Sequence, residues 1–128
     1  MNVTGLRAGN LIRVKPKNHQ EGFLFIKDMQ PSSVICEMYS PRRGYMFRIK
    51  YEELLPIYLT QEWLSKTGFT KDPEHEQLWY SPGHKLRIRW AENGVTFEDH
   101  SSSPSSSVHE LQNEYKKLTG EELVLTDK

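Results

Sequence analysis

The chain has 128 residues, a single cysteine and equal numbers of basic and acidic residues, 17 of each. One cysteine excludes an intramolecular disulfide and a cysteine-based zinc site, and the length predicts one domain with its own hydrophobic core. No run of apolar residues approaches the ~18 that a membrane span needs, and the first residues lack the apolar segment of a signal peptide. We therefore expect an intracellular, soluble protein without a membrane partner.

The charged residues are unevenly distributed along the chain. Residues 1–50 hold nine Lys and Arg against three Asp and Glu, a net charge of +6, and residues 51–128 hold eight against fourteen, a net charge of −6. This asymmetry indicates charged partners if the two halves fold apart, and internal charge pairing if they interleave. The sequence leaves both outcomes open.

Residues 1–59 predict a basic β-meander. Four short segments carry the alternation or the apolar runs that are typical of strands, and turns rich in Pro, Gly and Ser separate them. Strands of this number and length indicate a small SH3-like barrel, or half of one. The predicted strands are residues 11–15, 23–26, 34–39 and 45–49, and residues 52–55 are expected to form a helical turn.

Residues 60–128 begin with a short predicted helix and a second meander. Thr60 is the predicted N-cap of the helix, and Gly68 ends it. Three strands follow, and Asn93-Gly94 is a hairpin signal between the last two because both residues accept positive φ. The predicted strands are residues 78–80, 85–90 and 95–98.

The C-terminal helix, residues 108–119, is the clearest element of the sequence. Its apolar residues recur at spacings of three and four, so they line one face. Ser107 and Glu110 form a predicted capping box, and Gly120 ends the helix. Residues 101–107, just before it, form a serine-rich segment that we expect to be a flexible, exposed loop. The apolar face consists of Val108, Leu111, Tyr115 and Leu118.

These elements together predict an α+β fold in a single domain of residues 1–128. Its first part, residues 1–59, is the basic meander. Its second part, residues 60–128, contains the short helix, the three-stranded meander, the serine-rich loop and the C-terminal helix.

No group of residues predicts a catalytic centre or a metal site. The five histidines show no HxH, HxxxH or HExxH spacing, so a metal site would need long-range folding. Cys36 lies in a strand-like run without a neighbouring histidine, which favours a buried thiol over a nucleophile. Neither a glycine-rich phosphate loop nor a Gly-x-Ser-x-Gly turn is present. We expect no cofactor, no metal and no enzymatic activity.

A set of cations and aromatic residues in the first half is the strongest candidate for a binding surface. The cations alternate along two predicted strands, so their side chains share a face, and aromatic residues interleave with them. Cations beside exposed rings suit single-stranded nucleic acid, by phosphate neutralisation and base stacking. The alternative is a solvated strand face with its aromatic residues inward. The candidate residues are Arg13, Lys15, Lys17, Tyr39, Arg42, Arg43, Tyr45, Arg48 and Lys50.

Three segments together resemble a group of small uncharacterised proteins encoded in bacterial phages and prophages. The first is the start Leu6-Arg7-Ala8-Gly9-Asn10-Leu11, and the second is residues 57–64 followed by Gly68-Phe69. The third and most specific is the C-terminal motif HxLQNxYxxLTGEEL of residues 109–123. The resemblance implies a mobile-element protein that acts inside a bacterial cell.

Three functions are compatible with these observations. The first is a non-enzymatic phage protein that inhibits a host defence nucleoprotein, as an anti-CRISPR inhibits an RNA-guided nuclease. The second is a small RNA- or single-stranded-DNA-binding module that acts through the basic N-terminal meander, and the third is a phage assembly protein. We expect a host defence protein or ribonucleoprotein as the partner, RNA as the second candidate partner, and a monomer located in the cytoplasm of the bacterial host.

Overall fold

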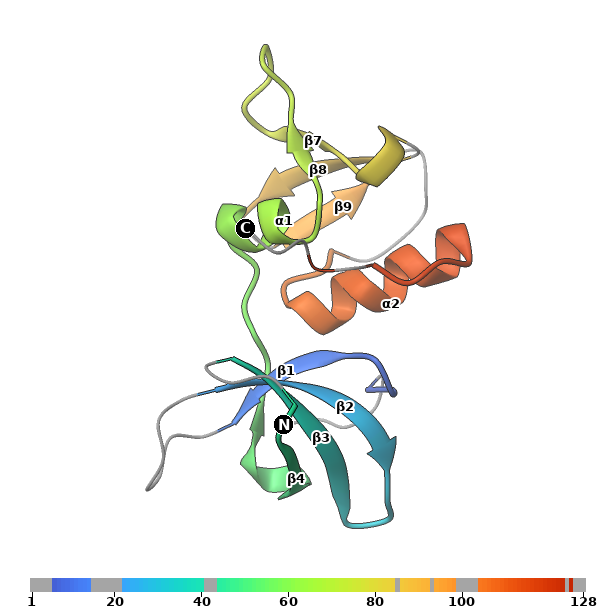
Figure 1. Ribbon diagram of the computed structural model, residues 1–128. Helices are drawn as coiled ribbons and strands as arrows, with labels where there is room; N and C mark the ends of the chain where they lie inside the picture. Colours follow the sequence, from blue (N-terminus) through green and yellow to red (C-terminus); the bar gives the residue numbers. More distant parts are fainter. Residues whose placement is uncertain are drawn as a thin grey trace. The chain divides into compact units, whose positions relative to one another are not determined.

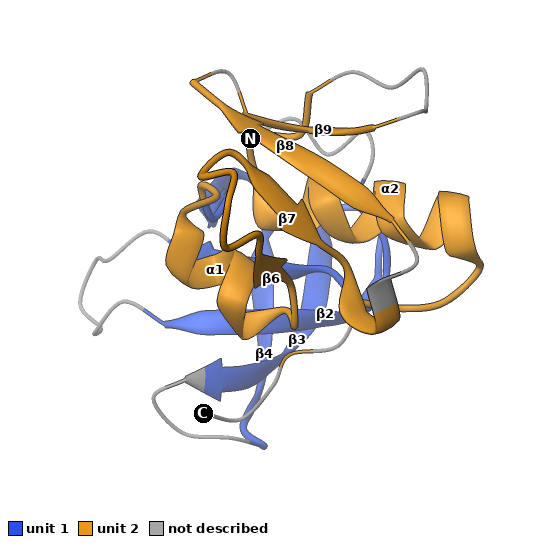
Figure 2. Ribbon diagram, turned by 90° about the horizontal axis from the view of Figure 1, so that it is seen from above, with its two compact units in different colours: residues 1–57 blue, residues 58–128 orange. Residues whose placement is uncertain are grey.

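The computed structural model describes residues 6–14, 22–40, 44–84, 86–92, 94–98, 104–123 and 125. Within these residues it has the α+β fold that the sequence predicts, with nine strands in two antiparallel sheets. The chain divides into two compact units, residues 1–57 (unit 1) and residues 58–128 (unit 2), which Figure 2 distinguishes by colour. Unit 1 contains the five-stranded sheet, and unit 2 contains the four-stranded sheet and both α-helices.

Unit 1 is a curled half-barrel with the strand order β4-β3-β2-β1-β5 (Figure 1). β1 pairs antiparallel with β2 on one side and with β5 on the other, and a short 3₁₀ helix, η1, leads from β4 into β5. The four predicted strands are all present. Of the predicted helical turn, residues 52–55, the first two belong to η1, whereas Leu54 and Leu55 form the strand β5, because they pair with the distant β1. The bounds of these elements are β1 Leu11–Val14, β2 Phe23–Met29, β3 Ser33–Ser40, β4 Met46–Lys50, η1 Tyr51–Glu53 and β5 Leu54–Leu55.

The core of unit 1 follows from the alternation of side chains along its strands. Every second residue of β2 and β3 faces a common apolar cluster, and we call the opposite side of β2, β3 and β4 the outer face. Burial raises the pKa of the Cys36 thiol to about 12, because the thiolate would lose its hydration, so the thiol stays protonated at neutral pH. The buried cluster is Leu6, Ile12, Leu24, Ile26, Val34, Cys36 and Leu54.

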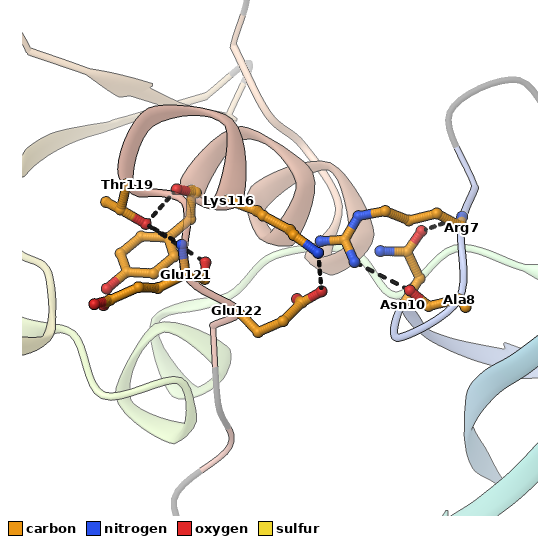
Figure 3. A network of polar contacts seen from close by, with 8 residues as sticks. Arg7, Ala8, Asn10, Lys116, Thr119, Glu121 and Glu122 are labelled. Atoms are coloured by element: carbon orange, nitrogen blue, oxygen red, sulfur yellow. Dashed lines mark hydrogen bonds and ion pairs between the residues drawn. The ribbon is translucent and has the colours of Figure 1, made fainter.

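A polar turn holds the segment that precedes β1. The side-chain oxygen of the buried Asn10 accepts a hydrogen bond from the backbone N–H of Arg7 at 2.8 Å (Figure 3). The carbonyl of Asn10 accepts from the N–H of Ile26 at 2.9 Å, and Gly9, with a φ of 97°, donates to the carbonyl of Ile26 at 2.7 Å. Residues 6–11 therefore form a turn that sets the start of β1.

Unit 2 contains a sheet of order β6-β7-β8-β9, and α2 runs alongside it (Figures 1 and 2). β7, β8 and β9 are the three predicted strands. β6 was not predicted, since two exposed residues carry no hydrophobic alternation. The bounds are α1 Gln61–Lys66, β6 Thr70–Lys71, β7 Leu78–Tyr80, η2 Pro82–His84, β8 Arg87–Ala91, β9 Gly94–Phe97 and α2 Val108–Thr119.

Both α-helices begin at the predicted caps. The Thr60 hydroxyl accepts from the N–H of Trp63 at 3.2 Å, and the Ser107 hydroxyl accepts from the N–H of Glu110 at 3.4 Å. α2 ends at Gly120, whose φ is 77°, as predicted. None of the helices in the described part of the chain combines the length and the apolar composition needed to cross a membrane.

The C-terminal turn of α2 is held by further side-chain contacts (Figure 3). The hydroxyl of Thr119 donates to the carbonyl of Tyr115 at 2.8 Å, and it accepts from the N–H of Glu121 at 3.1 Å. Lys116 pairs with Glu122 at 3.2 Å, across the end of the helix. Residues 115–122 therefore stabilise the end of the helix.

The serine-rich segment differs from the exposed loop that the sequence predicts. Ser105 and Ser107 are buried, and Ser105 exchanges two backbone hydrogen bonds with Val95 of β9, at 2.9 and 2.8 Å. Ser107 forms an isolated antiparallel bridge with Tyr58. The small side chains of Ser105 and Ser107 allow this close backbone pairing. The prediction of a flexible, exposed loop was therefore wrong for these residues. Residues 101–103 of the predicted loop lie outside the described residues.

Gly94, at the start of β9, permits this contact. A Cβ atom at this position would lie 2.3 Å from the carbonyl oxygen of Ser105, a distance that side chains do not reach, and its φ is 121°. Gly94 pairs directly with Ala91, so it belongs to the ladder of the hairpin. Glycine is therefore required here by a close backbone approach as well as by its positive φ.

Candidate binding surface on β2, β3 and β4

The outer face of unit 1 carries apolar and charged side chains in rows across three strands. Strand register places Phe25 of β2, Glu37 of β3 and Met46 of β4 next to one another. Ile35 lies opposite Arg48 in the neighbouring row of β3 and β4. Cross-strand neighbours of this kind lie about 5 Å apart, so their side chains are within reach of one another.

Two aromatic rings meet at one end of the outer face. Phe25 and Tyr39 make an edge-to-face contact, with centroids 5.5 Å apart and planes at 82°. Beside them Lys27 forms an ion pair with Glu37 at 3.3 Å, so these two charges neutralise each other. Together with Met38 these side chains line a hollow of about 370 Å³.

β4 is an edge strand with exposed apolar side chains. β3 pairs with one side of it, and no described segment pairs with its other side. Tyr45 is 53% exposed, Met46 53% and Phe47 40%. Register places Phe47 opposite the buried Cys36, on the inner side of the sheet, yet much of its ring stays in water. Three consecutive exposed apolar residues on an unpaired edge indicate a surface for contact with another molecule.

Two cations alternate with these apolar residues. Arg48 and Lys50 are exposed on the outer face, and within the described part of the chain neither forms an ion pair. Arg48 donates a hydrogen bond to the hydroxyl of Ser33 at 3.2 Å, which steadies the guanidinium above β3. Unit 1 as a whole holds nine Lys and Arg against five Asp and Glu, a net charge of +4. The β4 edge is therefore both apolar and positively charged.

The structure brings part of the predicted cation and aromatic set together. Tyr39, Tyr45, Arg48 and Lys50 lie on β3, on β4 or directly before β4. Arg13 lies on β1, separated from β4 by β2 and β3, and its Nε donates to the carbonyl of Pro56 at 2.8 Å, next to the end of β5. Lys15, Lys17, Arg42 and Arg43 lie outside the described residues.

The surface also contains residues that the sequence did not single out. Met46 is as exposed as Tyr45, and Phe25 packs its ring against Tyr39. Met46 directly follows Tyr45, a predicted site residue, so its place in the sequence could have suggested it. Its exposure, however, depends on β4 being an edge strand. Phe25 lies in a short apolar run, and such a run does not reveal which residues face outward.

Catalytic residue types also meet at the start of α2. The hydroxyl of Ser107 donates to the carboxylate of Glu110 at 2.8 Å and lies 3.2 Å from Nδ1 of His109. Ser107 is 2% exposed, so this arrangement serves as a helix cap. Among the described residues no cluster of three His, Cys, Asp or Glu side chains is placed to hold a metal ion.

The β4 edge and the adjoining outer face are thus the feature on which a functional proposal depends. They combine aromatic rings, apolar groups and cations, which are side chains that bind another molecule through non-covalent contacts. Comparison of the chain with models of protein families, with curated proteins and with solved structures found no match.

Proposed function

We propose that this protein is a non-enzymatic binding protein that acts through the β4 edge of unit 1. The observation that carries the proposal is the run of three exposed apolar residues at the edge strand β4, with Tyr45 directly before the strand and Met46 and Phe47 on it. Exposed apolar surface costs free energy in water, roughly 25 cal/mol per Å², and binding recovers it. Tyrosine and arginine are also enriched among the residues that dominate binding energy at interfaces.

The partner in this proposal is a host defence nucleoprotein. Specifically, it is an RNA-guided nuclease, which the protein inhibits as an anti-CRISPR does. The resemblance of the terminal motifs to phage and prophage proteins supports this choice, and it places the protein in the cytoplasm of a bacterial host. A stoichiometric inhibitor works by covering a surface, so it needs complementary contacts and no reactive group. The positive charge of unit 1 suits an acidic protein surface beside a nucleic-acid channel.

A titration of nuclease activity tests the proposal. Purified full-length protein is added to a loaded RNA-guided nuclease, and cleavage should fall to zero near equimolar protein. The double variant Tyr45→Ser, Met46→Ser should inhibit at least tenfold less, because it removes the exposed apolar side chains. Tyr58→Ser is the matched control, since Tyr58 is 63% exposed but lies in unit 2. Equal loss of inhibition in both variants would contradict a role of β4, and absence of inhibition by the wild type would contradict this choice of partner.

A small RNA-binding module is the second candidate function. Arg48 and Lys50 of β4 and Tyr39 of β3 lie on the outer face, and cations together with a ring on one face are the combination that single-stranded nucleic acid requires. This function predicts that the logarithm of the binding constant falls with the logarithm of salt concentration, by about 0.7 for each phosphate neutralised. Affinity for an RNA oligonucleotide that does not change with salt would contradict it. An assembly protein, the third function, would show higher oligomers in light scattering.

A further inference from the structure

The unpaired side of β4 indicates how a protein partner docks. Building on the proposed function, we infer that β4 binds an extended segment of the partner as an additional strand, with acidic side chains of that segment beside Arg48 and Lys50. The partner segment is a peptide in which acidic and apolar residues alternate, and its acidic residues lie on the outer face. Its apolar residues lie on the inner side, beside Phe47.

The backbone of β4 supplies the first argument. Residues from Glu37 back to Ser33 of β3 pair in register with residues from Met46 to Lys50 of β4. In an antiparallel ladder every second residue directs its N–H and C=O toward the paired strand, and the residues between them direct theirs away. An edge strand with such outward groups is a template for a further strand, and many proteins bind peptides in this way.

The other sheet edges supply the second argument. β5 and β6 have only two residues each, too few to form a ladder with a partner. The free side of β9 is occupied by Ser105. Among the edges in the described residues, β4 is therefore the one that is both long enough and open.

The alternation of side chains along β4 determines which type of partner strand fits beside it. Met46, Arg48 and Lys50 face outward and Phe47 faces inward, so a strand added beside them meets cations on one side and an apolar ring on the other. Opposite charges on neighbouring strands are favourable and like charges are unfavourable. A second copy of the chain, paired over all five residues of β4, would place Arg48 opposite Arg48. Charge therefore favours an acidic segment over self-association.

A designed peptide tests the docking mode. The probe is a blocked peptide of alternating Glu and Val residues, about eight residues long, which matches a typical strand. Binding to the ¹⁵N-labelled full-length protein should shift the amide signals of β4 and slow hydrogen exchange at its outward-facing amides. A Lys-Val peptide of the same length should bind at least tenfold more weakly, because it places like charges together.

Backbone methylation separates strand addition from other contacts. Two forms of the probe carry N-methyl groups, one on the Glu amides and the other on the Val amides. Only one set of amides faces β4 in an added strand, so one form should lose binding and the other should retain it. Equal binding of both forms would overturn strand addition, as would the absence of any change in β4 exchange at saturating peptide.

Charge reversal completes the test. The variant Arg48→Glu, Lys50→Glu should bind the Glu-Val peptide about tenfold more weakly and the Lys-Val peptide more tightly. Lys71→Glu, on the exposed edge strand β6 of unit 2, is the matched control and should change neither affinity. Protection of β4 by an RNA oligonucleotide but not by the peptide, or a dimer in light scattering, would overturn the inference. Nuclease inhibition that survives the loss of peptide binding would overturn strand addition alone, whereas peptide binding without inhibition would overturn the proposed partner.

Discussion

Two edge strands of this protein, β4 in unit 1 and β9 in unit 2, differ in whether another segment covers their free side. The chain itself covers β9, where Ser105 and Val95 exchange two backbone hydrogen bonds. No described segment pairs with the free side of β4. The comparison teaches that an edge strand becomes a candidate binding site only where the rest of the fold leaves it open.

The side chains of the two strands match this difference. Three of the four residues of β9 are buried, whereas four of the five residues of β4 are exposed. The units also differ in charge, because unit 1 has a net charge of +4 and unit 2, with eight Lys and Arg against twelve Asp and Glu, has −4. The closed edge is buried within unit 2, and the open edge leaves the apolar and charged side chains of β4 exposed in unit 1.

The chain has natural reporters for the two units. All three tryptophans lie in unit 2, so tryptophan fluorescence follows that unit alone. The single cysteine, Cys36, is buried in the core of unit 1, and its raised pKa keeps the thiol unreactive while that core is closed. Alkylation of Cys36 therefore reports the opening of unit 1.

The largest expected effect comes from opening the closed edge. Gly94→Ala places a Cβ atom 2.3 Å from the carbonyl oxygen of Ser105 and forces alanine to a φ of 121°. We expect the free energy of unfolding of unit 2 to fall by about 3 kcal/mol or more, from backbone strain and steric overlap together. Urea denaturation followed by tryptophan fluorescence measures it.

Gly83→Ala, in the same unit, is the matched control for this change. Gly83 also has a positive φ, 74°, but a Cβ atom there would meet nothing within 4 Å. It should cost about 1 kcal/mol, the strain alone. Equal losses in the two variants would show that the contact between Gly94 and Ser105 does not stabilise the closed edge.

A smaller effect should come from the cap that anchors the covering segment to α2. Ser107→Ala removes the acceptor of the Glu110 N–H and the partner of the Glu110 carboxylate. Loss of such a cap costs about 1–2 kcal/mol, to be measured by the same denaturation. Ser106→Ala removes only an exposed hydrogen bond from the Ser106 hydroxyl to the carboxylate of Glu110, at 3.2 Å, and should change stability by less than about 0.5 kcal/mol. A Ser106 effect as large as that of Ser107 would contradict the assignment of the cap.

The stability of unit 2 should also depend on pH through His109. Burial lowers the pKa of His109 below its ordinary value of 6.5, although Glu110 opposes the shift. As the pH falls below 6.5 the unfolded chain takes up the proton first, so stability falls until the pH reaches the pKa of the folded state. His109→Gln should flatten this part of the curve of unfolding free energy against pH. Titration of Asp72 is separate from that of His109, because the hydrogen bond from Tyr80 lowers the pKa of Asp72 and this carboxyl titrates in more acidic solution. A slope that is unchanged in His109→Gln would contradict the prediction.

The smallest effect on stability is expected at the open edge. Met46→Ser removes a side chain that is 53% exposed, so the free energy of unfolding should change by less than about 0.5 kcal/mol. Cys36 alkylation should remain as slow as in the wild type, while partner binding falls. Faster alkylation would mean that Met46 belongs to the core of unit 1, and it would weaken the contrast with β9.

Local patterns were sufficient for much of the fold. The spacing of Val108, Leu111 and Tyr115, with Ser107 and Gly120 at the ends, predicted α2 to the residue. The main strands were predicted within a few residues, because their alternation and turns are also local features. For the candidate site, the sequence named Tyr39, Tyr45, Arg48 and Lys50, which the structure places on or beside β3 and β4.

Only the tertiary structure decided how these elements use their surfaces. It placed the Arg13 guanidinium on the carbonyl of Pro56, buried Ser105 beside β9, and left one side of β4 without a partner strand in the described part of the chain. Each of these features depends on pairing between segments far apart in the chain, and the hydrophobic period of a single segment does not encode its distant neighbours. The sequence by itself determined which residues form strands and helices, whereas long-range backbone pairing determined which edge is closed and which stays unpaired among the described residues.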